Sequence, residues 1–137
     1  MSERRVHASL IIKSNDVQAE HIAKMMSPLT GSTLSKGEPV SSRPNASLAT
    51  HSIWRLSTKL LPTGLGEDSS ISEHIEWILG VIEGKQQTID ELAVNCDVEL
   101  SCFLSTDSTN YWFDVPHGIV KKLANQKIDL VFDVYAS

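Results

Sequence analysis

The sequence predicts an α+β domain in which helices pack mainly on one face of an antiparallel or mixed sheet. First, stretches of alternating polar and apolar residues interleave with stretches of helical spacing along the whole chain. Second, both hairpins and crossovers are expected between the strands, and the helices are too few to cover both faces of a sheet. Third, 137 residues with 41% hydrophobic side chains can bury one sizeable core, so residues 1–137 are predicted to form a single domain.

The N-terminal part begins with a strand that is followed by a helix. Apolar residues alternate with polar ones over 6–13, which is typical of a half-buried strand. Residues 14–16 then offer side-chain oxygens for a helix N-terminus, and apolar residues recur at helical spacing over 17–26. Residues 27–50 are rich in Ser, Thr, Gly and Pro, so they are predicted to form a long loop with one short strand.

The middle of the chain carries the clearest helix signal. Residues 52–60 alternate again and predict a strand that is covered on both faces. Ser70 and Glu73 are spaced as a capping box, in which each side chain accepts a backbone amide of the other residue, so a helix is predicted to begin there. Gly84 interrupts this helix, and a second helix is expected to continue to Cys96.

The C-terminal part predicts three more features. Residues 98–104 alternate, turn residues follow, and 111–115 form another extended run, which together predict a hairpin. A short helix is expected over 119–123. Residues 128–135 are apolar on both faces, so this last strand is expected inside the sheet. The strand–helix–strand order near both ends resembles two ferredoxin-like halves.

Charge is distributed unevenly along the chain. The formal net charge is −5, but the first 62 residues carry eight Lys and Arg against four Asp and Glu, whereas the remainder carries four against thirteen. Between Glu67 and Asp114, eleven acidic residues accompany a single Lys or Arg, Lys85. Because such a stretch repels phosphate, no nucleic-acid partner is expected. Two interpretations remain: the basic half pairs internally with the acidic half, or the acidic stretch docks a basic protein.

The cysteines and the apolar segments indicate a reducing, aqueous setting. Cys96 and Cys102 lack the spacing of zinc or thioredoxin-like sites, and they are expected in the core. No segment is apolar enough over a sufficient length to cross a bilayer, and the N-terminus has no signal-peptide pattern. A cytoplasmic protein with no membrane partner is therefore expected.

Four short motifs are similar to those of a known family. They are KGE at 36–38, WRLS at 54–57, DVELSC at 97–102 and IDLVFDVY at 128–135. With this layout, the chain resembles the bacterial domain of unknown function 4279 family over most of its length. The resemblance implies no established activity and no catalytic residues. Small acidic α+β proteins of this kind also resemble toxin-neutralising immunity proteins.

The sequence contains no recognised catalytic or metal-binding motif. Asp129 and Asp133 share a strand face and could share a proton or hold a cation, but a sheet with one solvated face presents such residues as well. On a helix, Glu73 and Glu76 share a face that His74 does not join, so the three do not converge on a metal. The sequence therefore predicts no catalytic residue, no metal site and no cofactor, and it leaves enzymatic activity as the less favoured alternative.

Two functions are consistent with these observations. The first is a protein-interaction module of the immunity type that uses acidic residues and an exposed tryptophan to bind a basic protein partner. Its candidate residues are Trp112, Asp114, Glu99, Asp107, Glu73 and Glu76. The alternative is a small-molecule binder or enzyme whose pocket is closed by the 27–50 loop, with Lys36 and Arg43 as binding residues. Both functions are compatible with a monomer or a homodimer.

Overall fold

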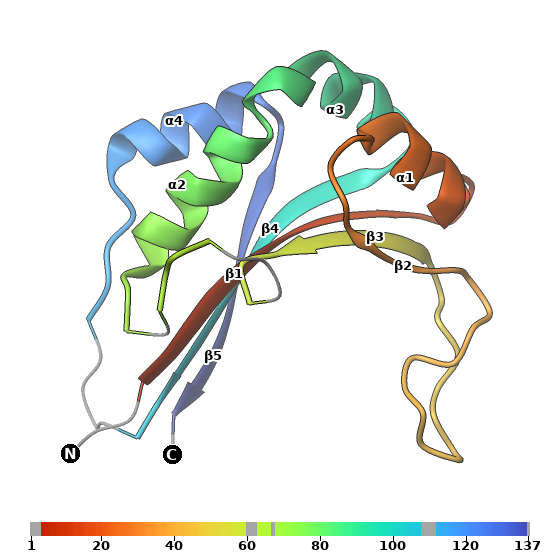
Figure 1. Ribbon diagram of the computed structural model, residues 1–137, viewed down its shortest axis with the longest axis horizontal. Coiled ribbons are helices and arrows are strands. Elements are labelled where there is room, and N and C mark those ends of the chain that lie inside the picture. Colours follow the sequence, from red (N-terminus) through yellow and green to blue (C-terminus); the bar gives the residue numbers. More distant parts are fainter. Residues whose placement is uncertain (1–3, 60–62, 67, 108–111, 137) are drawn as a thin grey trace.

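The fold is known from a computed structural model that describes residues 4–59, 63–66, 68–107 and 112–136. Its strands and helices follow one another along the chain in an alternating order (Figure 1). They are β1 (Arg4–Ser14), α1 (Ala19–Met26), β2 (Ser32–Leu34), β3 (Ser52–Ser57), α2 (Ile71–Val81), the 3₁₀ helix η1 (Glu83–Lys85), α3 (Gln86–Leu92), β4 (Asp97–Thr106), α4 (His117–Asn125) and β5 (Asp129–Ala136).

The five strands form one mixed sheet in the order β2-β3-β1-β4-β5. The pairs β2·β3, β3·β1 and β1·β4 are antiparallel, and β4·β5 is parallel. Strands β1 to β4, with α1 and α2 between them, have the connectivity of one ferredoxin-like unit. Helix α4 then leads to β5 as a parallel crossover at the margin of this unit. The predicted α+β class with a mixed sheet is confirmed, and the two strand–helix–strand halves, β1–α1–β2 and β3–α2–β4, make up one ferredoxin-like unit.

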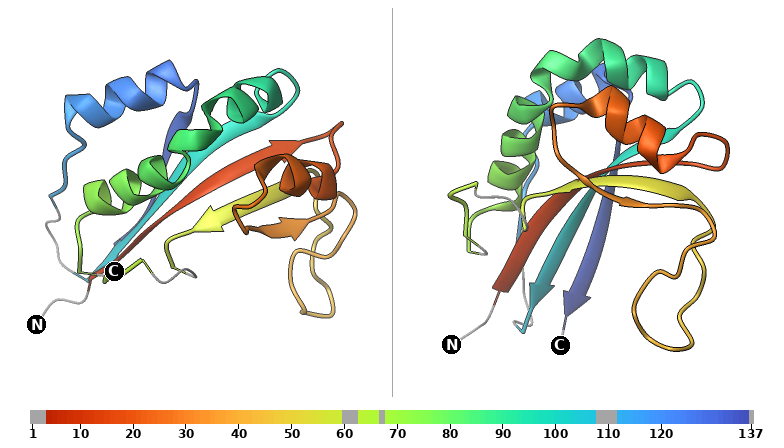
Figure 2. Two further views of the ribbon diagram at one scale, coloured as in Figure 1. Left: turned by 45° about the horizontal axis from the view of Figure 1, so that its top comes forward. Right: turned by 45° about the vertical axis from the view of Figure 1, so that its right-hand side comes forward.

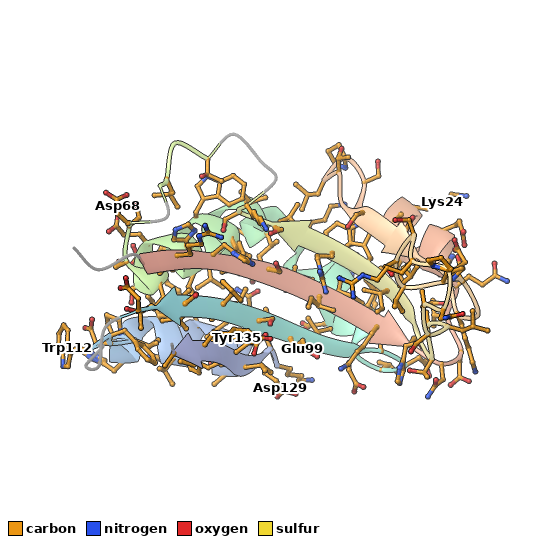
Figure 3. All side chains as sticks on the ribbon, turned by 90° about the horizontal axis from the view of Figure 1, so that it is seen from below. Lys24, Asp68, Glu99, Trp112, Asp129 and Tyr135 are labelled. Atoms are coloured by element: carbon orange, nitrogen blue, oxygen red, sulfur yellow. The ribbon has the colours of Figure 1, made fainter. Side chains whose placement is uncertain are left out.

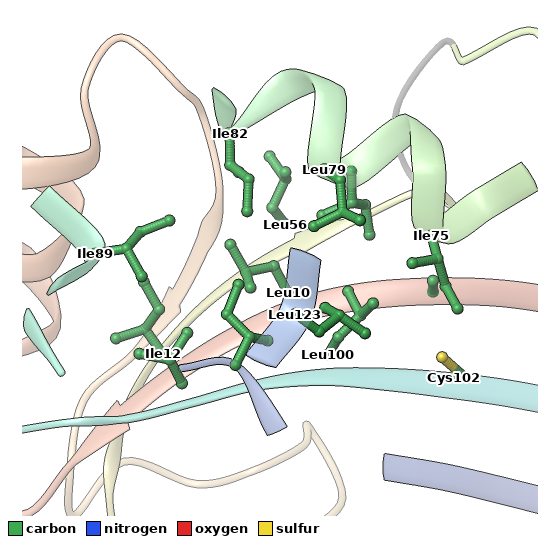
Figure 4. Packing of buried hydrophobic residues seen from close by; sticks show 14 of the residues in the cluster. Leu10, Ile12, Leu56, Ile75, Leu79, Ile82, Ile89, Leu100, Cys102 and Leu123 are labelled. Atoms are coloured by element: carbon green, nitrogen blue, oxygen red, sulfur yellow. The ribbon is translucent and has the colours of Figure 1, made fainter. Parts of the chain in front are cut away.

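All four α-helices lie on one side of the sheet, and the other side carries none of the described helices (Figures 1 and 2). The even-numbered residues of β1 from Val6 onward and those of β4 face the helices and are buried. Leu10 of β1 and Leu100 of β4 thus meet Ile75 and Leu79 of α2 and Leu123 of α4 in a single hydrophobic cluster (Figure 4). Burial of side chains of this size contributes roughly 1.5–3 kcal/mol each.

The local signals in the middle of the chain are confirmed. Ser70 Oγ accepts the Glu73 backbone N–H at 3.2 Å, and a Glu73 carboxylate oxygen accepts the Ser70 N–H at 3.2 Å, which completes the capping box of α2. The helix changes to 3₁₀ geometry around Gly84, where the sequence predicted a break. Helix α1 begins at Ala19 without a side-chain cap. The Ser14 hydroxyl instead accepts the N–H groups of the turn that precedes it.

Two predictions about strand pairing are wrong. Residues 112–115 form no hairpin with β4, and residue 111 lies outside the described part of the chain. Strand β4 is already paired with β1 on one edge and β5 on the other, so it has no edge left for a hairpin partner. Strand β5 itself lies at the margin of the sheet rather than inside it. Its apolar residues on both faces contact aromatic rings, Phe113 on the helix side and Phe103 on the other side.

The 27–50 segment carries the one short strand that was expected, β2, and then extends away from the sheet (Figure 1). An isolated bridge between Pro39 and Leu48 closes the base of this excursion. Gly37 has a φ of 92°, a conformation that only glycine adopts without strain, and this permits the turn that starts it.

A buried histidine connects three parts of the fold. His74 of α2 places Nδ1 at 2.8 Å from the Thr58 hydroxyl and Nε2 at 3.1 Å from the Gly66 carbonyl oxygen. Because a carbonyl only accepts, Nε2 carries a hydrogen and donates it to Gly66. The Thr58 hydroxyl is also within hydrogen-bonding distance of the Ala8 carbonyl oxygen, at 3.3 Å. The Thr58 oxygen in turn accepts the Ala8 N–H at 3.0 Å. These bonds fix the segment after β3 between α2 and β1.

Candidate functional site

The open face of the sheet is the surface that the helices leave uncovered. Strand register places the odd-numbered residues of β1, β4 and β5 on it, because paired residues share a face and the even-numbered residues of β1 point into the core. Figure 3 views this face from below, with Glu99, Asp129 and Tyr135 along the β4–β5 side.

Opposite charges occupy the two halves of the open face. On β4 and β5 all its charged side chains are acidic, and neither strand contains Lys, Arg or His. These acids are Asp97, Glu99, Asp129 and Asp133. On β1 and β3 the charged side chains of this face are basic, namely Arg5, Lys13 and Arg55. The face is therefore negative toward the β5 margin and positive toward β3.

One ion pair joins the two halves. Lys13 Nζ lies 2.8 Å from a carboxylate oxygen of Glu99, whose side chain is only 16% exposed. The hydrogen bond to Glu99 raises the pKa of Lys13, with further attraction from Glu99 and Asp97, while desolvation acts in the opposite direction. Asp97, Asp129 and Asp133 are exposed, so they remain accessible to a positively charged partner.

Aromatic rings cross the open face near the other end of the strands. His7 of β1 stacks on Phe103 of β4, with ring centroids 4.7 Å apart and an interplanar angle of 16°. Phe103 contacts Tyr135 of β5 at 5.4 Å. Between this row and the Lys13–Glu99 pair, Ser9 is aligned with Ser57 on one side and Ser101 on the other. Short side chains therefore separate the aromatic row from the ion pair.

Strand β5 is the most exposed apolar element of the sheet. On the open face, Val131 and Tyr135 expose 40% and 56% of their surfaces, and Val134 on the helix side exposes 52%. Phe132, on the helix side, is 37% exposed and contacts Phe113 at 5.1 Å between ring centroids. A row of apolar side chains beside exposed carboxylates is typical of a surface that binds another protein.

A family model for a domain of unknown function, DUF4279, matches residues 4–137. The chain belongs to this family. The resemblance that the four short motifs indicated is thus confirmed over nearly the whole chain, and the family's description assigns no activity. No curated protein and no solved structure matches the chain significantly.

The DUF4279 domain separates the acidic residues that the sequence singled out. Glu73 and Glu76 belong to α2 in the helix layer, whereas Glu99 lies on the open face and is paired with Lys13. Glu76 faces Lys122 across a hollow of about 400 Å³ between α2 and α4. One continuous acidic surface over all these residues is therefore absent from the described structure.

The segment before α4 lies at the start of α2. The Ser72 hydroxyl donates to the Asp114 backbone carbonyl at 2.6 Å. Asp114 therefore contacts the residue that precedes Glu73 in the sequence. Trp112, in the same segment, is 79% exposed, as expected for a docking residue. Asp107 is exposed at the end of β4. Asp114 and Glu73 thus lie near the start of α2, in the helix layer rather than on the open face, and Trp112 is two residues from Asp114 along the chain.

Lys36 and Arg43 do not share a site. Lys36 lines a hollow of about 550 Å³ at the base of the 27–50 segment, together with Asp16 and Glu20. Arg43 lies at the outer end of the segment, where the surrounding residues all come from the segment itself. Only the first of the two residues faces a cavity formed by several elements.

Asp97, Asp129, Asp133 and Tyr135 are the binding candidates that the sequence did not select. Asp129, Asp133 and Tyr135 were recognisable as one strand face, but their proximity to Asp97 depends on the pairing of β4 with β5. Within the described ranges, no three His, Cys, Asp or Glu side chains are grouped to hold a metal ion. Likewise, no helix in the part of the chain described here could cross a membrane.

Proposed function

We propose that this DUF4279 domain is a protein-interaction module that binds a basic polypeptide on the β4–β5 half of its open face. The observation that carries the proposal is the combination of four carboxylates with exposed apolar side chains on two strands that contain no base. Apolar contacts supply affinity at such surfaces, and charge complementarity supplies specificity and fast association. Immunity proteins that neutralise basic toxins use this chemistry, so an immunity-type role is included in the proposal.

A matched pair of charge-reversal variants tests the proposal. The first variant replaces Asp97, Asp129 and Asp133 with Lys, and the control replaces Glu83, Asp90 and Glu91, which are exposed acids of η1 and α3 in the helix layer, with Lys. Both variants change the net charge equally. Each tagged protein is used to capture partners from its own cells, and the captured proteins are quantified by mass spectrometry at two salt concentrations.

We expect the wild type and the control to capture equal amounts of a basic protein. The first variant should capture at least about tenfold less of it. Its capture by the wild type should also weaken at high salt, because the charges of the open face are exposed. Equal capture by both variants would contradict the proposal, and so would equal loss in both.

A second candidate function is binding of a small polar molecule in the hollow beside Lys36. The specific observation is that the β1–α1 turn, α1, the end of β2 and the start of β3 surround this cavity of about 550 Å³ with both acidic and basic side chains. Metabolites would then raise the thermal midpoint of the wild type but not of Lys36→Met. If no compound discriminates between the two proteins, this second candidate is refuted.

A further inference from the structure

We infer that β5 receives an extended, basic segment of the partner as an additional strand of the sheet. This inference rests on the proposed function and specifies how the partner is bound. In β-strand addition, main-chain hydrogen bonds to a free sheet edge provide affinity, and alternating side chains provide specificity.

The first argument is the position of β5. It pairs with β4 in parallel over Asp129 to Ala136, and within the described residues the sheet order has no strand beyond it. In a parallel pair, alternate residues direct their N–H and C=O groups toward the neighbouring strand, and the residues between them direct these groups outward. Strand β5 thus offers a regular series of donors and acceptors along eight residues.

The second argument is that β5 is protected against pairing only by negative charge. Edge strands are normally short, or carry charged side chains, Pro or a bulge that prevents pairing with other chains. The opposite margin follows this rule, since β2 has only three residues. Strand β5 is much longer, has neither Pro, Gly nor Lys, and keeps an unbroken register with β4. The charges of β5 are Asp129 and Asp133, which repel acidic segments and attract basic ones. The fold therefore leaves one margin available for pairing.

The third argument concerns the side chains that an added strand would meet. On the open face these are, in order, Asp129, Val131, Asp133 and Tyr135. Directly opposite residues on neighbouring strands interact, and opposite charges stabilise the pair. The added strand is therefore expected to carry basic residues opposite the two carboxylates and an apolar residue between them, with a basic–x–apolar–x–basic pattern. The x residues lie on the helix side beside Phe132 and Leu130, so they should be apolar too.

The same charges argue against a second copy of this chain as the added strand. Strand β5 has no basic residue to place opposite Asp129 or Asp133. A two-fold axis perpendicular to the sheet would also bring together the two copies of α4, which packs beside β5 and carries Lys121 and Lys122. Like charges near each other oppose association. A basic segment of another protein places positive charges opposite Asp129 and Asp133 and brings no second copy of α4, whereas a second copy of this chain does neither.

Peptides test the inference with the full chain. The probe is a fluorescent peptide of sequence Thr-Lys-Val-Ile-Val-Lys-Thr, and the controls are the same peptide with Glu in place of Lys and two isomers that are N-methylated on alternate amides. In an added strand only one set of alternate amides faces β5. We expect saturable binding of the probe below about 1 mM by fluorescence anisotropy. One methylated isomer should bind as the probe does, and the other should lose at least about tenfold in affinity.

Protein variants and hydrogen exchange complete the test. The double variant Asp129→Asn with Asp133→Asn should weaken probe binding by about tenfold, and the control Asp90→Asn with Glu91→Gln should not. The probe should also protect β5 amides that exchange in the free protein. Equal binding of the two methylated isomers with a loss in the Asp variant would overturn strand addition and leave the proposed function standing. Absence of probe binding, or a dimer held by β5 in sedimentation experiments, would also overturn the inference, whereas the capture experiment judges the proposed function separately.

Discussion

Replacement of Gly31 by Ala should destabilise the protein because this glycine lies directly against a buried tryptophan. A Cβ atom at Gly31 would lie 2.5 Å from Cε2 and 2.7 Å from Nε1 of Trp54, and 2.7 Å from the backbone oxygen of Arg55. Carbon atoms in contact normally keep about 3.5–4.0 Å between them, so the overlap exceeds about 1 Å. Trp54 is completely buried, and the carbonyl belongs to β3, so neither group can move without displacing the sheet.

The expected cost lies toward the upper end of the range for overpacked cores, about 2–3 kcal/mol. Urea unfolding followed by far-ultraviolet circular dichroism measures it as a lower midpoint with an unchanged slope. In a Trp54→Phe background, Gly31→Ala should cost less than in the wild type, because Phe lacks the indole atoms that are closest to the new methyl group. Part of the cost persists because the Arg55 carbonyl remains in place.

Gly80→Ala is the matched control. Gly80 lies in α2, and a Cβ atom there would meet nothing within 4 Å. The substitution should stabilise the protein by about 0.5–1 kcal/mol, because Ala has the higher helix propensity. If Gly31→Ala costs less than about 0.5 kcal/mol, or if both variants change stability in the same direction, the packing argument is refuted.

Three further predictions concern buried and paired groups. His74→Ala should cost about 2–4 kcal/mol in urea unfolding, more than Thr58→Val, because it removes two hydrogen bonds and leaves a cavity; a cost below about 0.5 kcal/mol would contradict this. Burial raises the pKa of the Cys102 thiol to about 12. The unfolded chain therefore releases this proton first, and the contribution of Cys102 to stability is complete below about pH 8.5 and declines as the pH approaches 12. At pH 10.5 the wild type should lose about 2 kcal/mol more than Cys102→Ala, relative to pH 8, and equal losses would refute the assignment. A double-mutant cycle of Lys13→Met and Glu99→Gln should give a coupling of about 0.5 kcal/mol that weakens in 1 M salt; absence of any coupling at low salt would contradict this prediction.

Features that depend on neighbouring residues could be predicted from the amino-acid sequence. The capping box at Ser70 and Glu73 begins α2, and Gly84 changes its geometry, because these effects act within one or two helical turns. The alternation of β1 predicted which residues reach the core for the same reason, since successive side chains of a strand point to opposite faces. Even the face shared by Asp129 and Asp133 followed from their spacing.

The arrangement of the strands in the sheet depends on long-range contacts that the sequence pattern does not contain. The alternation of β4 is equally compatible with a hairpin to the following residues and with pairing to β1 and β5, and the long-range contacts selected the second arrangement. Likewise, apolar residues on both faces of β5 are compatible with a central strand or with a margin covered by aromatic rings. Periodicity records the face on which a side chain lies, but it contains no record of which strand lies beside it. The grouping of four carboxylates beside a free sheet edge therefore depends on pairings between residues that are far apart in the chain.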